Sequence, residues 1–238
     1  PQKSGKTEGW HDAAFFNMRR PLELVFSNGM DKGVRIGPAT GNVEDMTTFE
    51  QFYDAYKKQM DYAIQLLVNA DNAIDMAHAE RCPLPFLSSM VDDCMKVGKT
   101  VQEGGAVYNF TGPQGFGVAN MADSLYSVKT LVYDEKKITM GELKEALATN
   151  YGKGLGAEDV AAMTAKIANE LKEAGKTIGE KEVAAILNTV VAASEAPEVK
   201  ANGERILKLI EEVPKFGNDI PEVDAFARDV AYTYTEPL

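Results

Sequence analysis

The tripeptide Trp10-His11-Asp12 holds the strongest chemical candidates in this chain, which has one tryptophan and two histidines. A carboxylate beside an imidazole can hold a hydroxylated ligand or move a proton to or from it. The apolar run from Trp10 to Phe26 has helical spacing, at Phe15, Met18, Leu22 and Val25. Asp12 can therefore also accept backbone N–H groups as the cap of a helix. The residues alone favour the cap, and the two roles are compatible.

A glycine-rich segment, from Val101 to Leu125, is the second candidate for a site. Gly104 and Gly105 precede a short apolar stretch, Ala106 to Phe110, which predicts a strand, and Thr111-Gly112-Pro113 predicts a turn. Gly115 and Gly117 flank Phe116, which indicates a close backbone approach or a positive φ. A strand, a glycine-rich corner and a helix in succession are typical of a functional site.

Two other polar clusters have simpler explanations. His78 and Glu80 are two residues apart and do not share a helix face, so His78 with Arg81 is interpreted as a helix C-terminus, where cations oppose the dipole. Arg19-Arg20 could bind an anionic group, but a structural salt bridge is the preferred interpretation.

Several classes of site are excluded by spacing. Cys82 and Cys94 are twelve residues apart in a chain with two histidines, so no zinc-type cluster is expected and both are interpreted as reduced, buried thiols. Gly-Lys-Thr occurs at 5–7, 98–100 and 175–177. Asp93 and Glu170 stand where the second and third copies would need the first glycine of a phosphate-binding loop, and the first copy has no room for it. Nucleotide binding is therefore not expected.

Composition bounds the class of protein. The chain has 238 residues, a net charge of −11 and a pI of about 4.8, which argues against general nucleic-acid binding. No apolar run approaches the length of a membrane-spanning helix, and no signal segment opens the chain. A cytoplasmic location without membrane attachment is expected. The polar opening at Pro1 suggests an internal piece of a longer protein.

Helices must position these candidates. A capping box at Thr47 and Glu50 predicts a long helix to about Ala79, whose aromatic-rich apolar face is interpreted as core. Prolines 83 and 85 end it. Further helices are expected over about 118–133 and, after a second capping box at Thr139 and Glu142, to Asn150.

Composition changes beyond this point. From Gly152 to Lys215 there is no aromatic residue, Cys or His, although the chain has 20 aromatic residues. The pattern predicts amphipathic helices over about 157–174, 179–194 and 201–212, with breaks at Gly175, Pro197 and Gly203 and a stop at Pro214. We interpret 152–212 as an inserted or expanded helical lobe that offers little for binding a small polar substrate, and its role stays open.

Four segments in order resemble the glycyl radical enzymes, the pyruvate formate-lyase-like family. They are PQKSGKTEGWHDAAFFN (1–17), GGAVYNFTGPQGFGVANMADSL (104–125), KKITM (136–140) and FGND (216–219). The first is similar to the sequence that directly follows the Cys-Val-Glu motif in dehydratase-type members. The resemblance covers about 1–151 and 213–238.

The resemblance implies a radical mechanism. A glycyl radical, installed by an S-adenosylmethionine-dependent activating enzyme, generates a thiyl radical that takes hydrogen from a small hydroxylated substrate, and water or a similar group then leaves. It further implies that Asp12 contacts the substrate hydroxyls, with His11 and Phe15 beside it, and it moves substrate contact slightly ahead of the helix cap. The chain has neither Cys-Val-Glu nor the glycine-radical motif. We therefore expect it to be inactive alone and to bind no separate cofactor.

The resemblance also implies a fold. We expect a helix-dominated α/β piece of the family's α/β barrel, with 1–151 as a barrel-derived segment, 152–212 as the inserted lobe and 213–238 as the return to the barrel. The implied partners are the small-molecule substrate, the activating enzyme and a second copy in a homodimer. An arylacetate decarboxylase of the same family, and a helical scaffold that has lost the chemistry, remain as alternatives.

Overall fold

The computed structural model describes residues 6–10, 13–153, 183, 185 and 196–238. The chain forms two compact units. The first unit consists of Pro1–Leu125 with Lys215–Leu238, and the second of Tyr126–Pro214. The glycine-rich segment, and the strands that carry the N-terminal block, belong to the first unit.

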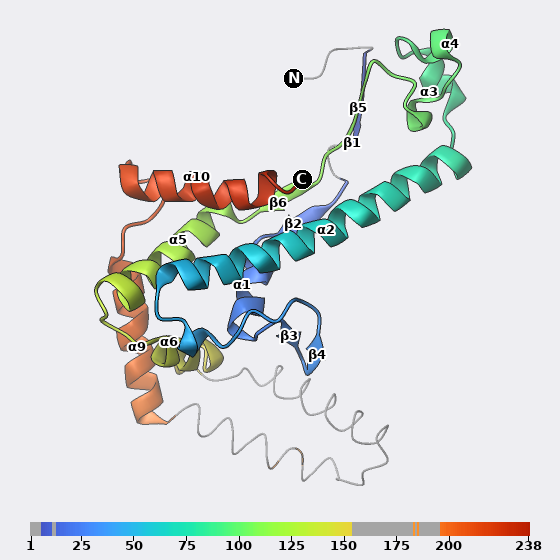
Figure 1. The fold of residues 1–238 in the computed structure, drawn as a ribbon. Coiled ribbons are helices and arrows are strands. Elements are labelled where there is room, and N and C mark those ends of the chain that lie inside the picture. Colours follow the sequence, from blue (N-terminus) through green and yellow to red (C-terminus); the bar gives the residue numbers. More distant parts are fainter. Residues whose placement is uncertain (1–5, 11–12, 154–182, 184, 186–195) are drawn as a thin grey trace. The chain divides into compact units, whose positions relative to one another are not determined.

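Two parallel strand pairs form the frame of the first unit (Figure 1). The strands β1 (Thr7–Trp10) and β2 (Phe15–Asn17) pair with β5 (Tyr108–Thr111) and β6 (Gln114–Phe116) respectively. A two-residue hairpin, β3 (Met30–Asp31) with β4 (Val34–Arg35), is antiparallel. Parallel strands require a long crossover, and residues 18–107 supply it.

The crossover begins with a helix that is shorter than the sequence predicts. Residues 7–10 and 15–17 are strands, and α1 covers only Arg19–Phe26. The helical interpretation of Trp10 to Phe26 is therefore wrong over its first part, because hydrogen bonding to distant strands outweighs local periodicity. The Asn17 side chain accepts a hydrogen bond from the Arg19 amide at 3.1 Å. Pro21 lies in the first turn of α1, where its missing N–H is tolerated.

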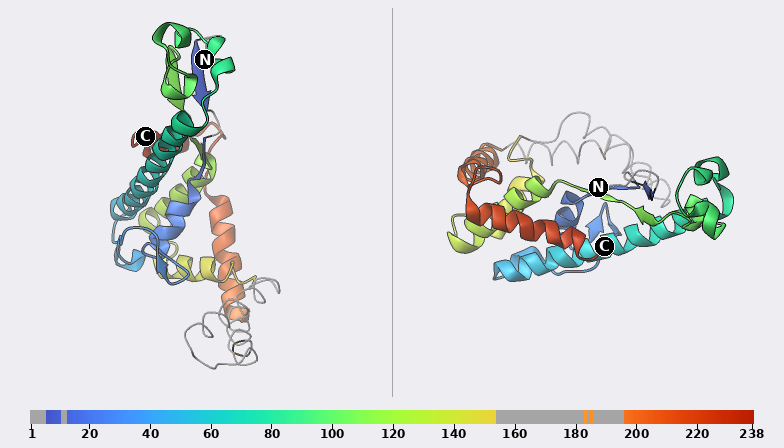
Figure 2. Two further views of the ribbon diagram at one scale, coloured as in Figure 1. Left: turned by 90° about the vertical axis from the view of Figure 1, so that its right-hand side faces the viewer. Right: turned by 90° about the horizontal axis from the view of Figure 1, so that it is seen from above.

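The long helix α2 (Phe49–Arg81) carries the main core of the first unit. Its buried apolar residues recur at helical spacing, at Phe49, Phe52, Tyr56, Met60 and Ile64. It packs on α1 and on α10 (Pro221–Thr235), and Figure 2 shows α2 and α10 side by side in its right-hand view. Phe52 meets Phe26 of α1 at 5.7 Å between ring centroids, and Phe49 meets Phe226 of α10 at 6.0 Å.

The capping box of α2 lies one residue later than predicted. Thr48 is the cap, and its hydroxyl accepts from the Gln51 amide at 3.3 Å. The Gln51 side chain reaches back to the amides of Thr48 at 3.3 Å and Thr47 at 2.8 Å. Glutamine thus takes the place predicted for Glu50, since its side-chain oxygen accepts from both threonine amides.

Short elements connect α2 to β5. Helix α2 ends at Arg81, before the two prolines as predicted, and α3 (Pro85–Ser89), α4 (Cys94–Val97) and the 3-10 turn η2 (Val101–Glu103) follow. A further 3-10 turn, η1 (Val43–Asp45), precedes α2. Cys94, Val101 and Ala106 form a small buried cluster with Val91 against it.

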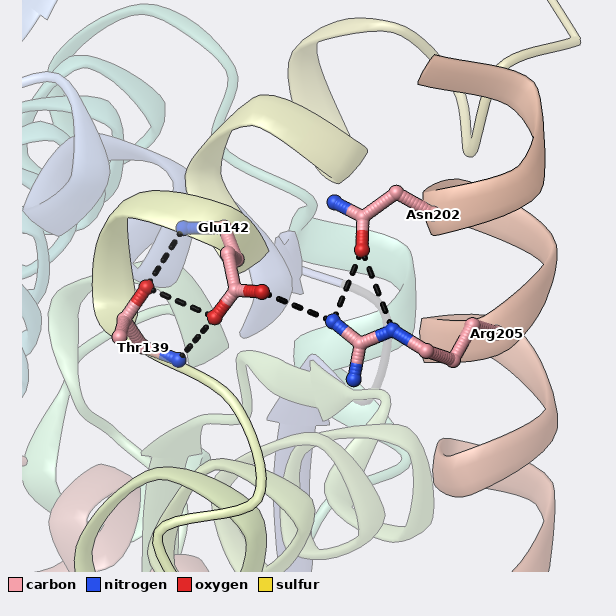
Figure 3. Close-up of polar contacts among 4 residues, drawn as sticks. All are labelled: Thr139, Glu142, Asn202 and Arg205. Atoms are coloured by element: carbon pink, nitrogen blue, oxygen red, sulfur yellow. Dashed lines mark hydrogen bonds and ion pairs between the residues drawn. The ribbon is translucent and has the colours of Figure 1, made fainter. Parts of the chain in front are cut away.

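Helix α5 (Val118–Val128) follows β6 and continues as the π-helical segment η3 (Lys129–Asp134), close to the predicted 118–133. The second unit also contains α6 (Met140–Ala148), capped by Thr139 and Glu142 as predicted, and α9 (Pro197–Glu212). Helix α9 packs on α6, and Arg205 donates to Glu142 at 2.8 Å (Figure 3).

One predicted helix break is wrong, and one predicted helix begins too late. Gly203 lies inside α9, which begins at Pro197, where proline is favoured, and not at 201. A Cβ at Gly203 would stand 2.3 Å from the Tyr151 carbonyl, so this glycine permits a close approach to the turn after α6. The predicted helices 157–174 and 179–194 lie outside the described residues, and the lobe 152–212 stays a prediction.

Candidate functional site

The N-terminal block and the glycine-rich segment are brought together by parallel pairing. Trp10 is registered with Thr111 at the end of β1–β5, and Phe15 with Gln114 at the start of β2–β6. The Gln114 amide donates to the Ala14 carbonyl at 2.8 Å, and the Met18 amide to the Phe116 carbonyl at 3.0 Å. Two segments about a hundred residues apart in sequence therefore form one local structure.

The two paired segments have different numbers of residues between these two registered pairs. Residues 11–14 separate Trp10 from Phe15, whereas only Gly112 and Pro113 separate Thr111 from Gln114. The β1–β5 and β2–β6 pairs are two separate two-stranded sheets, and the longer of the two connecting intervals lies on the N-terminal side. The predicted site residues His11 and Asp12 belong to this interval and lie outside the described residues.

The helix-cap role considered for Asp12 is wrong. Helix α1 begins at Arg19, and the side-chain oxygen at its start comes from Asn17. The residues after Asp12 continue into a strand instead.

Phe15 and Phe16 contact different aromatic partners across the strand pair. The Phe15 ring meets Phe116 edge to face at 5.3 Å, and the two are 66% and 49% exposed within this chain. Phe16 meets Tyr234 of α10 at 5.3 Å. Since successive strand side chains alternate between faces, α10 covers the face of Phe16, and the face of Phe15 is uncovered by the described residues.

The glycines of the corner behave as the sequence predicts. A Cβ at Gly115 would lie 2.7 Å from the Tyr234 ring, so glycine permits the close approach there. Gly117 has φ +98°, a conformation that side chains rarely adopt, directly before α5.

The C-terminal block, FGND (216–219), contacts the helix that follows the glycine-rich segment. The Phe216 amide donates to Asp123 Oδ1 at 2.8 Å, which ties FGND to the first turns of α5. Three of the four blocks are thus joined within the first unit, and KKITM (136–140) belongs to the second.

Polar residues on α2 were missed by the sequence analysis. Asp71 is buried and Asp75 half-buried, one helical turn apart, and the Thr111 hydroxyl donates to the Asp75 carboxylate. Burial, and then the Asp75 charge, raise the pKa of Asp71 above its usual value. The signal was available, because two carboxylates at i and i+4 continue the buried face of α2 where apolar residues are expected.

A cavity of about 320 Å³ lies beside these groups. Its lining comes from α2, from η2 with Gly104, and from β5: Asn72, Asp75, His78, Val101, Gln102, Gly104, Asn109, Phe110 and Thr111. Within the described residues, no group of three or more His, Cys, Asp or Glu side chains could hold a metal ion.

The remaining polar motifs have the structural roles that the sequence favoured. Arg20 forms ion pairs with Glu23 and Asp31, each at 2.7 Å. His78 and Arg81 lie in the last turn of α2. Both cysteines are free thiols, and Cys94 is buried as predicted, whereas the predicted burial of Cys82 is wrong, because it lies exposed at the C-cap of α2. None of the helices in the described ranges has the length and apolar character that a membrane crossing requires.

Comparison with protein families gives one match over residues 1–238, to the family described as Pyruvate formate lyase-like. Among curated proteins, the (2S)-3-sulfopropanediol dehydratase of Klebsiella oxytoca is 38% identical over 150 residues. That alignment covers 62% of this chain and 18% of the relative.

Two solved structures are similar over the whole chain. The first, described for 1,2-propanediol dehydration in Roseburia inulinivorans, is 57% identical with a TM-score of 0.91, and the match covers 28% of that protein. The second, the glycerol-bound form of the B12-independent glycerol dehydratase of Clostridium butyricum, is 45% identical with a TM-score of 0.76, and the match covers 24% of it. This chain therefore spans about a quarter or less of the length of these proteins.

Proposed function

Since this chain belongs to the pyruvate formate lyase-like family, the glycyl radical enzymes, we propose that the intact protein removes water from a small vicinal diol. The observation that carries the proposal is the match of the entire chain, at 57% identity, to the structure described for 1,2-propanediol dehydration. The pairing of β1 with β5 and of β2 with β6 supports it, because these strands belong to the two longest segments of the resemblance, 1–17 and 104–125.

The radical chemistry is assigned to parts of the intact protein outside this chain. Neither Cys82 nor Cys94 stands in a Cys-Val-Glu sequence. The glycyl radical, installed by a radical S-adenosylmethionine activating enzyme, would generate the thiyl radical that abstracts hydrogen from the substrate carbon. What this chain contributes is binding and proton transfer.

In this proposal, Asp12 binds the substrate hydroxyls and gives a proton to the hydroxyl that departs as water. A carboxylic acid within hydrogen-bonding distance of a leaving hydroxyl accelerates its departure. His11 is the second polar contact, and Phe15 lies on the uncovered face of β2 as an apolar wall that keeps water away. The loss of the helix-cap explanation for Asp12 supports this assignment.

The arrangement of the intact protein is also proposed. The two strand pairs are taken as part of the family's barrel, with further strands supplied by the remainder of the protein, since isolated two-stranded sheets are marginal. A homodimer in the cytoplasm, with the activating enzyme as a transient partner, completes the proposal.

A substrate screen tests it. The intact protein is activated anaerobically and supplied separately with propane-1,2-diol, glycerol, isethionate, hydroxyproline and an arylacetate. Propane-1,2-diol is expected to give propanal and water with the highest kcat/KM. Decarboxylation of the arylacetate without dehydration of any diol would instead establish the decarboxylase alternative. A protein that carries the radical but turns over none of these would favour the scaffold.

A further inference from the structure

The cavity of about 320 Å³ beside α2 is lined mainly by polar side chains. Nine described residues line it, and six of them carry a polar side chain: Asn72, Asp75, His78, Gln102, Asn109 and Thr111. All nine belong to the first unit. Asp75 is the one carboxylate among them, and none of the nine is a lysine or an arginine. The described lining therefore contains a negative charge without an opposing lysine or arginine.

The Asp75 carboxylate is only partly satisfied within the described part of the chain. It is half-buried, and it accepts a hydrogen bond from the Thr111 hydroxyl. The ion pairs formed between described residues do not include Asp75. An ionised carboxylate offers about four lone-pair sites, so one donor leaves most of its capacity unused. Because burial removes part of its water, this carboxylate requires a further donor.

Asp71 adds a second negative charge one helical turn before Asp75. It is buried, and it takes no part in the ion pairs between described residues. Carboxylates at i and i+4 of a helix repel each other. Burial, and then this repulsion, raise the pKa of Asp71 above its usual value. A positive group at Asp75 would relieve the repulsion, whereas an anion would increase it.

The amide side chains of the lining leave a further acceptor. Asn109 Nδ2 donates to the Ala106 carbonyl at 2.8 Å, and among the described residues the side-chain oxygen of Asn109 accepts no hydrogen bond. The Gln102 side-chain oxygen, in contrast, accepts from the Leu84 amide at 3.1 Å. The acceptors left on Asp75 and Asn109 require a ligand with several N–H donors, as an ammonium or guanidinium group has.

We infer that this cavity binds an organic cation through an ammonium or guanidinium group, with Asp75 as the countercharge and Asn109 as a second acceptor. Phe110 also lines the cavity, and an aromatic ring attracts cations to its face. A neutral polyol would leave the carboxylate charge unpaired. Within the described ranges no three His, Cys, Asp or Glu side chains are grouped to hold a metal ion. The inference does not depend on the proposed role of Asp12.

Two sources can supply this cation. One is a free small amine. The other is a lysine or arginine side chain from elsewhere in the intact protein, since this chain covers only 28% and 24% of the two solved relatives. The Tm of the intact protein distinguishes the two sources.

Asp75→Asn tests the countercharge in amine-free buffer. Asparagine keeps an acceptor for Thr111 and removes the charge. If a side chain of the protein fills the cavity, the variant leaves that cation without its partner, and Tm is expected to fall by about 2 °C or more. If no cation is bound in this buffer, the substitution relieves the repulsion from Asp71, and Tm stays or rises. Asp92→Asn, at an exposed aspartate between α3 and α4, is the matched control and should keep the wild-type Tm.

Titration with n-propylammonium or methylguanidinium chloride tests the free amine. For an open site, either probe should raise the Tm of the wild type by about 2 °C or more at saturation and leave that of Asp75→Asn unchanged. Tetramethylammonium chloride is the control, because it carries the same charge without an N–H donor.

The two measurements together decide the inference. A lower Tm in Asp75→Asn supports a cationic side chain of the protein, and a rise with the N–H probes alone supports a free amine. A Tm that is unchanged or higher in Asp75→Asn, together with no selective response of the wild type to the N–H probes, would overturn the inference.

Discussion

At the scale of single residues, the case for Asp12 depends on its neighbours. It follows Trp10, which is registered with Thr111, and precedes Phe15, which is registered with Gln114. No helix begins near enough to need its carboxylate as a cap, since α1 starts at Arg19. Asp12 itself lies outside the described residues, and its role in the reaction stays a proposal.

Asp12→Asn in the intact protein is therefore expected to lower kcat by roughly 10²-fold or more, the contribution of a general acid. The amide keeps the shape and cannot donate the proton. The glycyl radical should still form, as measured by electron paramagnetic resonance, because its carriers lie elsewhere. Wild-type kcat and KM in this variant would exclude a role of Asp12 in the reaction.

At the scale of elements, α2 links the core to the site. Its N-terminal half buries an apolar stripe, and its C-terminal half carries the buried Asp71 and presents Asp75 to Thr111 at the end of β5. The polar half costs stability through desolvation, which is visible in the raised pKa of Asp71. The apolar half, with α1 and α10, offsets this cost.

The cap of α2 gives a prediction at this scale. Thr48→Ala removes the acceptor for the Gln51 amide and is expected to lower the free energy of unfolding by about 1 kcal/mol. Thr47→Ala is the comparison variant, since it keeps the backbone amide bond to Gln51 at 2.8 Å and loses only the hydroxyl's hydrogen bond to the same side-chain oxygen at 3.3 Å, so a smaller loss is expected. Chemical denaturation of the intact protein measures both. An equal loss of unfolding free energy in the two variants would show that Thr48 is not the main cap of α2.

A second prediction concerns pH and the contact of α6 with α9. Hydrogen bonds from Thr139, and then Arg205, lower the pKa of Glu142 below its usual value. A lowered folded-state pKa stabilises the protein above the unfolded-state pKa of about 4.3, and this stabilisation is lost as pH falls through the folded-state value. Glu142→Gln should therefore lower Tm at pH 7, with the difference from wild type shrinking below about pH 4.

The control for this prediction is Glu204→Gln, an exposed glutamate on α9. Its Tm should follow that of the wild type across the same range. A pH-independent difference for Glu142→Gln would show that its carboxylate charge contributes nothing to the contact.

At the scale of the whole molecule, the residues proposed to act in the reaction and the predicted helical lobe 152–212 lie in different parts of the chain. The paired strands, α2 and α10 belong to the first unit, while α6 and α9 belong to the second. The aromatic-free stretch from Gly152 to Lys215 offers little to a small polar ligand. We keep the proposal that 152–212 is a peripheral helical lobe.

Replacement of 156–211 by a short Gly/Ser linker in the intact protein tests this proposal. We expect kcat/KM to stay within a few-fold, because no residue assigned to the reaction is removed. Stability should fall, because α9 packs on α6 and Gly203 lies against Tyr151. A folded deletion protein without activity would show that the lobe reaches the substrate site.

The sequence by itself determined the family, the order of its four blocks and the approximate bounds of α2, of α5 with η3, and of α6. Strong local signals carry such information: the prolines after Arg81 and the Thr139–Glu142 box each act within a few residues of themselves. The use of glycine at 115 and 117 was predicted as well, because few other residues tolerate a close approach or a positive φ.

Only the tertiary structure decided that residues 7–10 and 15–17 are strands and that α1 begins at Arg19. Their apolar spacing suits a helix, yet hydrogen bonds to strands about a hundred residues away make these residues extended. The same applies to Asp75 and Tyr234, which reach the corner from helices far along the chain. Parallel pairing and side-chain contacts across a long crossover depend on partners that no local pattern specifies.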